Sequence, residues 1–349
     1  MTAAHAHPPA PPHPRTPVPD VSFVVPVRDD AERLKHCLRG ILRNHSGVGI
    51  EVIVADNGST DGSAGVARAE RAVVLDLPDS RLGELRNRAA AFARGRILAF
   101  VDSDNEIGPD WVAACLESLN AGRTAAVGAP YHPPTPATWV QRLYDRLRRH
   151  PTAIESVDWL GSGNLAVRRS VFEEVGGFDP TLETCEDVDL CRKIRGCGYT
   201  VASDGRLGSV HHGDPRTLRE VFFGELWRGR DNVRVSLRAP RAWRTLASAA
   251  VPVVNLAALS LAIVGLLTLT SAGLAVVGGA AAFLGLAVAL RATMMVQGRA
   301  QARRSMRFWR DWPAAFSVAA AYEAGRALAL VGRFGHGRRR EPVPVRGVA

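Results

Sequence analysis

The sequence contains few cysteines, few aromatic residues and almost no lysine. Its five cysteines are odd in number and none lies in a CxxC spacing, which excludes a disulfide-stapled miniprotein and predicts reduced thiols in a cytosolic domain. Because 46% of the 349 residues are hydrophobic, an intrinsically disordered chain is excluded as well. The length suffices for one large α/β domain and a smaller second part.

Charge is absent from one long stretch. Residues 245–290 include no Asp, Glu, Lys or Arg over 46 positions and consist mostly of Ala, Val, Leu and Gly. A single helix of this length would measure about 69 Å, whereas the hydrocarbon core of a bilayer is about 30 Å thick. The stretch therefore predicts two transmembrane helices with a turn near residues 270–273. A buried helical hairpin is the alternative, but it would need much more protein around it.

Positive charge accumulates at the C-terminus. The chain has 42 arginines and two lysines, and residues 291–349 hold 12 of those arginines against three acids. Arginines also flank both ends of the uncharged stretch, whereas its turn has none. By the positive-inside rule, both ends and the N-terminal domain face the cytoplasm, which predicts a location at the inner (cytoplasmic) membrane. We interpret the basic tail as contacting anionic lipid headgroups, with nucleic-acid binding as the less favoured alternative.

Two further segments complete this organisation. Residues 1–19 are rich in Pro, Ala and His and lack the apolar core of a signal peptide, so we expect a disordered leader. Residues 312–331 are apolar but carry Glu323 and Arg326. This composition predicts an amphipathic helix at the membrane interface, with a third membrane span as the alternative.

Residues 21 to about 210 alternate short β-branched runs with amphipathic helical stretches, a pattern typical of βαβ units around a mainly parallel sheet. Four strands are predicted, at residues 21–27, 50–55, 72–75 and 96–101. The apolar residues of 31–43 recur every three or four positions, which predicts a helix with one buried stripe. Ligands of such sheets bind at the edge where strands pass into helices.

Acidic residues follow three of these strands. Asp29 comes after the first strand, Asp56 opens a polar loop after the second, and Asp102 and Asp104 follow the fourth. Capping and turn formation would use the same residue types. Several carboxylates that meet at one edge without cations repel one another, however, and favour a metal ion or a donor-rich ligand. Asp102 and Asp104 offer hard oxygen ligands suited to Mg²⁺ or Mn²⁺ bound together with a diphosphate.

An ordered series of motifs resembles the family 2 glycosyltransferases, which have the GT-A fold. The series consists of Ser22 to Val27, the loop of residues 56–63, Arg86-Asn87, Phe100 to Asp104, Gly161-Ser162-Gly163-Asn164, Gly176-Gly177-Phe178-Asp179 and Glu186-Asp187-Val188-Asp189-Leu190. It extends over about residues 21–212. The resemblance implies a Rossmann-like α/β catalytic domain, with a mainly parallel sheet and flanking helices, that takes a sugar from a nucleotide diphosphate sugar donor.

The resemblance also implies which residues bind the donor and the metal. Asp56 would contact the nucleoside, with Asp29 in the adjacent loop, and Asp102 would lie near the ribose. Asp104 and His211 would bind Mg²⁺ or Mn²⁺, and His212 is the alternative to His211. The other donor-binding residues would be Pro26, Arg86, Gly163 and Asn164. The planar fork of the arginine would suit a phosphate or a carboxylate of the nucleotide loop, and a surface-helix role is its alternative.

A second acidic pair matches the catalytic part of this family. Asp187 matches the general base, which would take the proton of an acceptor hydroxyl as it attacks the anomeric carbon, and a single displacement inverts the configuration. Gly177, Phe178 and Glu186 match the region that meets the acceptor. Ordinary alternatives are ion pairing on a helix face for the acidic pair and a helix C-cap for the glycine.

Residues 219–238 predict one helix, with aromatic side chains on one side and arginines elsewhere. Its place just before the uncharged stretch predicts that it lies on the bilayer and brings the site near a lipid-borne acceptor. Processive polysaccharide synthases of the family carry a Gln-x-x-Arg-Trp motif here, whereas this chain has Leu226-Trp227-Arg228. The difference argues against a processive polymerase.

These predictions combine into four parts. They are a leader at residues 1–19, a GT-A domain at 20–240, two transmembrane helices at 245–290, and a basic tail at 291–349. We expect an inverting glycosyltransferase that acts on a hydroxyl of a lipid-linked or glycan acceptor in cell-surface polysaccharide or glycolipid synthesis, with no nucleic-acid partner. Transfer to polyprenyl phosphate is the close alternative. A non-catalytic nucleotide-sugar-binding membrane protein is the alternative of another class.

Overall fold

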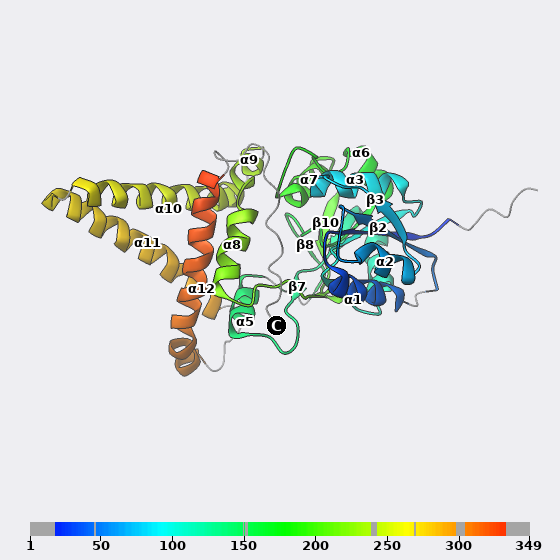
Figure 1. The fold of residues 1–349 in the computed structure, drawn as a ribbon, viewed down its shortest axis with the longest axis horizontal. Coiled ribbons are helices and arrows are strands. Elements are labelled where there is room, and N and C mark those ends of the chain that lie inside the picture. Colours follow the sequence, from blue (N-terminus) through cyan, green and yellow to red (C-terminus); the bar gives the residue numbers. More distant parts are fainter. Residues whose placement is uncertain are drawn as a thin grey trace, which may run out of the picture.

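The computed structural model describes residues 18–44, 47–148, 150, 153–238, 243–268, 270–297 and 304–332. An α/β domain built from the N-terminal part of the chain is joined to long C-terminal helices that project away from it (Figure 1). The predicted leader up to residue 17 and the predicted basic tail beyond residue 332 lie outside the described residues.

The centre of the α/β domain is an eight-stranded sheet in the order β3-β2-β1-β4-β9-β6-β10-β8. Its strands are β1 (Val21–Val27), β2 (Ile50–Asp56), β3 (Val73–Asp76), β4 (Ile97–Val101), β6 (Thr124–Gly128), β8 (Glu155–Ser156), β9 (Asn164–Arg168) and β10 (Thr200–Ser203). Only β9 and β8 pair antiparallel with their neighbours, so the predicted mainly parallel sheet is confirmed. All seven residues of β1 are buried because helices cover both faces of the sheet.

Two apolar layers hold the helices against the sheet. Phe23 and Val25 point to one face, where they pack with Leu34 and Trp111, while Val24 points to the other. The helices of the domain are α1 (Ala31–Leu42), α2 (Ser63–Ala69), α3 (Leu82–Phe92), α4 (Trp111–Asn120), α5 (Trp139–Tyr144), α6 (Arg169–Glu174) and α7 (Glu186–Gly196), with short 3₁₀ turns η1 (Asp145–Leu147) and η2 (Gly205–Leu207). Each fully buried Leu or Phe contributes about 1.5–3 kcal/mol to stability.

A small second sheet brings a late part of the chain to the end of β4. It has the order β5-β11-β7 and consists of β5 (Asn105–Ile107), β11 (Ser209–His211) and β7 (Tyr131–His132). His211 pairs with Asn105, which directly follows Asp104. This pairing positions a histidine from the end of the domain beside an aspartate 107 positions earlier in the chain.

The helix predicted over residues 219–238 is divided in the structure into α8 (Leu218–Arg228) and α9 (Asn232–Ser236). Asp231 causes the break, because its buried carboxylate accepts the amide of Glu183 at 2.7 Å and that of Thr184 at 3.3 Å. The buried residues of α8 are Val221 and Glu225 rather than the predicted aromatic side.

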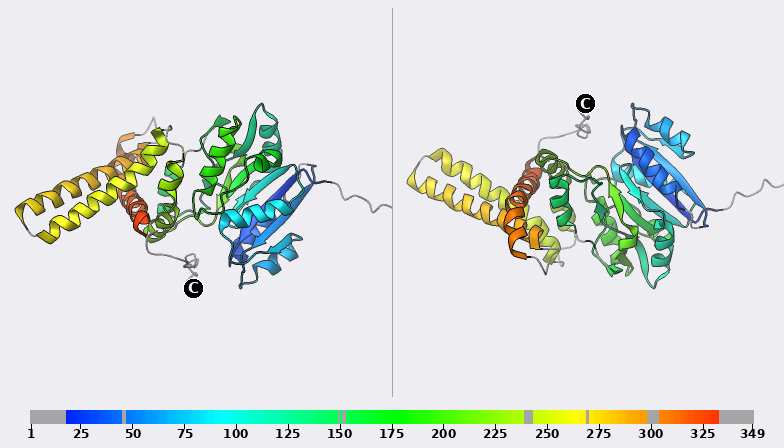
Figure 2. Two further views of the ribbon diagram at one scale, coloured as in Figure 1. Left: turned by 90° about the horizontal axis from the view of Figure 1, so that it is seen from above. Right: turned by 90° about the horizontal axis from the view of Figure 1, so that it is seen from below.

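Three long helices form the C-terminal part: α10 (Trp243–Thr268), α11 (Ser271–Gln297) and α12 (Arg304–Gly332). Helices α10 and α11 form a hairpin that extends away from the sheet in both views of Figure 2. Helix α12 crosses the open end of this hairpin and packs along α8 (Figure 1). All three are long and apolar enough to cross a membrane, and only 6% of the apolar window in α11 is buried.

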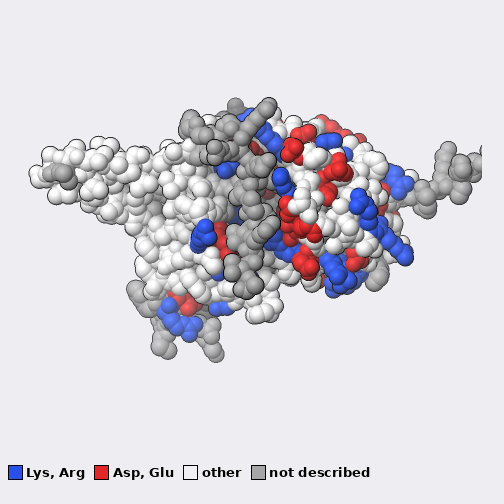
Figure 3. All heavy atoms as spheres, viewed as in Figure 1, with Lys and Arg blue, Asp and Glu red and all other residues white. Residues whose placement is uncertain are grey.

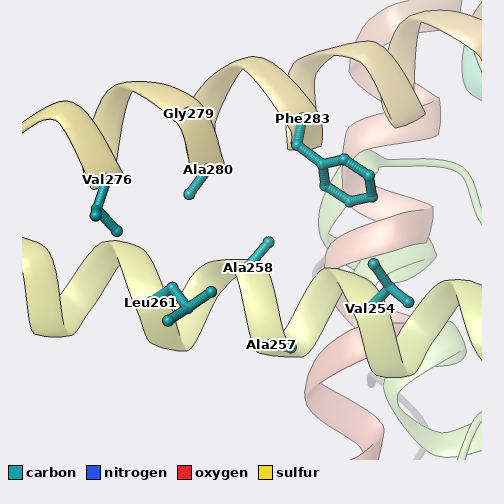
Figure 4. A pocket seen from close by; sticks show the side chains of 8 residues that line it. All are labelled: Val254, Ala257, Ala258, Leu261, Val276, Gly279, Ala280 and Phe283. Carbon is teal, nitrogen blue, oxygen red and sulfur yellow. The ribbon is translucent and has the colours of Figure 1, made fainter.

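The hairpin encloses an open, apolar hollow of about 380 Å³ between α10 and α11 (Figure 4). Side chains such as Val254, Leu261, Val276 and Phe283 line it. No titratable side chain lines it, so the chemistry of the protein must be sought in the α/β domain.

Candidate active site

The loops after β1 and β2 are joined by hydrogen bonds at the carboxyl edge of the sheet. The buried carboxylate of Asp56 accepts the amide of Ser59 at 2.8 Å, and the hydroxyl of Ser59 accepts the amide of Asp29 at 3.0 Å. Asp29 in turn accepts the amide of Thr60 at 2.7 Å. These bonds hold Asp29 in the left-handed region at φ 49°, which a residue with a side chain rarely adopts. Asp29 and Asp56 therefore belong to one rigid pair of loops.

A further hydrogen bond extends this arrangement to the loop after β4. The hydroxyl of Ser103 donates to Asp30 at 3.0 Å, and Ser103 lies between Asp102 and Asp104. Since β2, β1 and β4 are neighbours in the sheet, the three predicted acidic loops meet at one edge. The sequence prediction placed them there from strand order alone.

Arg86 of α3 connects this edge to the acidic pair of α7. The side chain is 1% exposed, and its two terminal nitrogens donate to Asp102 at 2.6 Å and to Glu186 at 2.7 Å. Burial would lower the pKa of this guanidinium, but the charges of Asp102 and Glu186 raise it, so the arginine stays protonated. Of the two partners that the resemblance allowed, Arg86 binds a carboxylate, and its fork is not available to a donor phosphate.

Asp187 follows at the first turn of α7. The residue before the acidic pair, Cys185, has φ 60°, so the helix begins from a left-handed position. One oxygen of Asp187 accepts the amide of Val188 at 2.7 Å. Burial, and then the nearby charge of Glu186, raise the pKa of Asp187 well above its usual range. A carboxylate with a raised pKa holds a proton more readily, as a general base must after it has accepted one.

In the loop after β4, Asp102 bonds Arg86, whereas Asp104 lies beside His211. Their nearest atoms, Oδ2 and Nε2, are 3.3 Å apart, and Nδ1 of His211 lies 2.6 Å from a carboxylate oxygen of Asp214. Arg148 donates to the same Asp214 at 2.7 Å. Burial would raise the pKa of Asp104, but the charge and hydrogen bond of His211 lower it to about 2. Burial would lower the pKa of His211, but Asp104 and Asp214 raise it to about 9.

The model of the family described as "Glycosyl transferase family 2" matches residues 22–176, which contain all three acidic loops. The resemblance indicated by the motifs is therefore confirmed for these residues. The chain is 28% identical to glycosyltransferase AglE of Haloferax volcanii over 60% of its own length and 70% of that protein. It is also 28% identical to the pre-mycofactocin glycosyltransferase of Mycobacterium tuberculosis, over 68% of its own length. It spans about half, 51%, of that relative.

A solved structure shares the fold of the glycosyltransferase domain and of the helices behind it. The mannosyltransferase PcManGT from Pyrobaculum calidifontis, in complex with GDP-Man and Mn²⁺, superposes with a TM-score of 0.61 at 17% identity. The superposition covers 92% of this chain and 88% of that one. The GT-A architecture expected from the sequence is therefore confirmed.

The residues beside Asp104 fit a divalent cation. A carboxylate oxygen and an imidazole nitrogen already point at one another, and both are ligands that Mn²⁺ accepts. Asp214 holds the far nitrogen of His211, as carboxylates commonly do behind a metal-binding histidine. A Cβ atom at Gly213 would come within 2.0 Å of Asp104, so glycine is needed there for the close approach. His212 bonds Glu106 at 3.2 Å instead, and so His211 is the better ligand.

Several predicted site residues of the glycosyltransferase domain act as its framework. Asn164 is fully buried and bonds Trp111, Ala129 and Leu207, so its amide cannot reach a donor. Pro26 is buried within β1. Gly163 supports the site by lacking a side chain, because a Cβ atom there would lie 2.3 Å from Asp102.

The predicted acceptor region needs a similar correction. Phe178 is 1% exposed and lies under the guanidinium of Arg86, with 5.6 Å from the guanidinium carbon to the ring centroid. Gly177 is buried, and Glu186 is buried against Arg86. Phe178 and Glu186 both contact Arg86, so these residues are packed inside the domain.

Sequence reasoning missed the residues that support His211. Asp214 lies three positions after it, where the motif His-His-Gly-Asp-Pro suggested a polar turn. Arg148 packs between the rings of Tyr131 and Tyr144, at 5.5 and 5.3 Å from their centroids. The histidine-aspartate spacing was a usable signal for Asp214, whereas nothing in the local sequence identifies Arg148.

Proposed function

We propose that the protein is a membrane-anchored, divalent-metal-dependent, inverting glycosyltransferase. It moves a sugar from a nucleotide diphosphate to a hydroxyl of a lipid-linked or glycan acceptor in cell-surface polysaccharide or glycolipid synthesis. The observation that carries the proposal is the continuous set of contacts from Asp102 through Arg86 to Glu186 and Asp187. It connects the loop that receives the donor with the carboxylate that receives the acceptor proton. The two curated relatives named as glycosyltransferases support the same reaction class.

The residues at the carboxyl ends of β2, β1 and β4 would bind the donor. Asp56 offers a buried carboxylate to N–H or hydroxyl donors of the nucleoside. Asp104 and His211 would hold Mg²⁺ or Mn²⁺. The ion would supply positive charge that offsets the negative charge developing on the departing diphosphate. Asp214 and Arg148 keep the imidazole of His211 turned toward Asp104.

Asp187 supplies the base. As the bond from the acceptor oxygen to the anomeric carbon forms, the bond from that carbon to the diphosphate oxygen breaks, and the hydroxyl proton passes to the Asp187 carboxylate. Attack from the face opposite the leaving group inverts the anomeric configuration. Burial and the nearby charge of Glu186 raise the pKa of Asp187, whereas the positive charge of Arg86, which bonds Glu186, lowers it.

The long helices suit a membrane anchor on the cytoplasmic side. Helices α10 and α11 are apolar over their whole circumference, and many of their large side chains are exposed in the isolated chain, including Leu261, Leu267, Leu274 and Leu286. With this hairpin across the bilayer, α12 and α8 lie along the membrane surface (Figure 1). The half-exposed Phe223 on α8 then faces lipid near the catalytic domain. This arrangement supports the proposal of a lipid-borne acceptor.

A donor screen tests the proposal directly. The full-length protein in detergent is incubated with UDP, GDP and dTDP sugars, with Mn²⁺ or with excess chelator, and release of nucleoside diphosphate is measured with and without a membrane lipid extract. We expect release with one donor class, stimulated by the extract and abolished by the chelator. Release that is equal with and without chelator would remove the metal assignment. Absence of release from every donor in the presence of lipid acceptors would contradict the enzyme proposal itself.

A further inference from the structure

A second group of metal-ligating side chains lies outside the candidate active site. His132 ends β7, Asp145 begins η1, and His150 follows shortly after. Each offers one ligand atom, and the three atoms lie within 4.8 Å of one another. Nε2 of His150 is 2.8 Å from the carboxylate of Asp145, and the rings of the two histidines stack with centroids 4.3 Å apart and planes 15° apart.

The donor set of this group differs from that at Asp104. Two imidazoles and one carboxylate are nitrogen-rich, which favours Zn²⁺ over Mg²⁺, since magnesium prefers all-oxygen sites. Tetrahedral zinc takes ligands about 2.0–2.1 Å away and in the plane of each imidazole, so the two stacked rings must rotate before both nitrogens bind one ion. Asp145 is buried and His132 is exposed, so an ion can enter from solvent and keep a water molecule as its fourth ligand.

The group is adjacent to the active site but separate from it. In the small sheet, His132 pairs with Val210, whose neighbour is His211, and Tyr131 stacks on His211 with 5.1 Å between ring centroids. Arg148 lies between the two groups, because it bonds Asp214 at 2.7 Å and approaches Asp145 only to 3.9 Å. A cation at Asp145 would therefore leave Arg148 its shorter bond to Asp214.

We propose that His132, Asp145 and His150 form a zinc-binding site. The ion joins the end of β7 to the turn after α5, and so fixes the segment that carries Tyr131 and Arg148 behind His211. The site is independent of the proposed glycosyl transfer, because it shares no ligand with Asp104 and His211.

Zinc binding to the purified, tag-free full-length protein in detergent tests this site. Every variant carries His5, His7 and His13→Ala, so that the N-terminal histidines cannot contribute, and Asp104→Ala, so that the active-site position cannot. Chelator-treated protein is dialysed against Zn²⁺ and the bound metal is measured by atomic absorption. We expect one equivalent of zinc in this background and none after His132→Ala combined with His150→Ala. The thermal midpoint should rise with zinc only in the first protein, because a ligand that binds the folded state stabilises it.

A matched control removes a different imidazole. His36→Ala deletes an exposed histidine that stacks on His212, and it should leave the zinc equivalent unchanged. Circular dichroism of the double variant checks that the fold persists. Equal zinc binding in the double variant and its parent overturns the proposal, as does the absence of bound zinc in the parent. In the latter case the two histidines are a stacked pair that binds no metal.

Discussion

The α/β domain and the helical hairpin treat charge in opposite ways. In the domain, charged groups enter the interior in matched sets, such as Arg86 between Asp102 and Glu186. The hairpin carries no charged residue from 245 to 290, and its surface is free of acidic and basic side chains in Figure 3, whereas both kinds gather on the domain. Buried charge persists only where partners compensate the loss of water, and a helix in lipid avoids the cost by having none.

The seam between the two regions, where α8 packs against α12, combines buried, paired charges with apolar side chains. Glu225 of α8 is buried and bonds Arg326 of α12 at 2.6 Å and the hydroxyl of Tyr144 at 2.6 Å. Around this group lie apolar side chains of four helices, including Val221, Ala292 and Val318. Both charged residues of the segment 312–331, Glu323 and Arg326, thus face protein, and the ion pair of Arg326 with Glu225 joins the catalytic domain to the long helices.

The largest effect on activity is expected from Asp187→Asn, which removes the carboxylate that we propose as the general base. Turnover should fall about 10²- to 10⁴-fold, since general base catalysis contributes that much. In the parent, turnover should increase with pH through the neutral range, because the raised pKa of Asp187 leaves it protonated on the acid side. The variant should lose this acid limb. Nucleoside diphosphate release measured across pH checks both expectations.

Glu183→Gln is the matched control, because Glu183 is an exposed acid just before α7 and should leave the pH profile unchanged. Substantial activity in Asp187→Asn would contradict a hydroxyl acceptor. It would favour a polyprenyl phosphate acceptor, whose oxygen is already ionised.

Asp104→Ala should lower divalent-dependent turnover about 10²- to 10³-fold, comparable to the loss of one electrostatic stabilising group at a reacting centre. Mn²⁺ titration of activity and of metal binding measures the change. Asp110→Ala, an exposed aspartate at the start of α4 whose side chain makes no capping bond, is the control. If Mn²⁺ binds Asp104→Ala as tightly as the parent, Asp104 is not a ligand.

Asp214→Asn should weaken Mn²⁺ binding about 10- to 100-fold while activity recovers at saturating metal, because the residue orients His211 rather than touching substrate. Isothermal titration with Mn²⁺ separates affinity from turnover. A fall in turnover at saturating Mn²⁺ with unchanged affinity would refute the positioning role. Asp110→Asn serves as the control here.

The smallest effect on chemistry, but a large one on stability, is expected at the seam. Glu225→Ala leaves Arg326 buried without its carboxylate, which typically costs about 3–5 kcal/mol. The thermal midpoint in detergent should fall and proteolysis at the seam should increase, while residual folded protein turns over within a few-fold of the parent. Glu220→Ala is the comparison, because Glu220 is a partly buried acid of α8 that bonds the amide of Arg216 rather than a residue of α12. Equal midpoints for the two variants would show that the seam depends on apolar contacts alone.

Local sequence patterns were sufficient to predict the strands and to predict that the acidic loops lie at one edge of the sheet. The β1 bounds agree with the prediction, and Asp102 and Asp104 follow β4 as expected, because strand order and hydrophobic period determine both. Contacts between residues far apart in the sequence could not be predicted. The division of the helix over 219–238 depends on Asp231 bonding backbone amides 47 and 48 positions earlier, and no local pattern encodes such a contact.

The same limit applies to the site. Arg86 looked like a donor ligand because a planar fork on a helix suits phosphate, but folding buries it between two carboxylates from distant loops. His211 against His212 was undecidable from adjacent identical residues. The fold separates them, because His211 ends β11 beside Asp104 whereas His212, the next residue, bonds Glu106.

Glu323 of α12 has partners on both helices of the hairpin, Asn255 of α10 at 2.9 Å and Arg291 of α11. Both partners leave the ribosome before Glu323 does. Until α10 and α11 have formed the hairpin, Glu323 lacks the two side chains that compensate its charge. Burying an uncompensated carboxylate in an apolar environment is costly, so the hairpin must form before α12 docks. Glu323 thus couples the docking of α12 to the correct arrangement of α10 and α11.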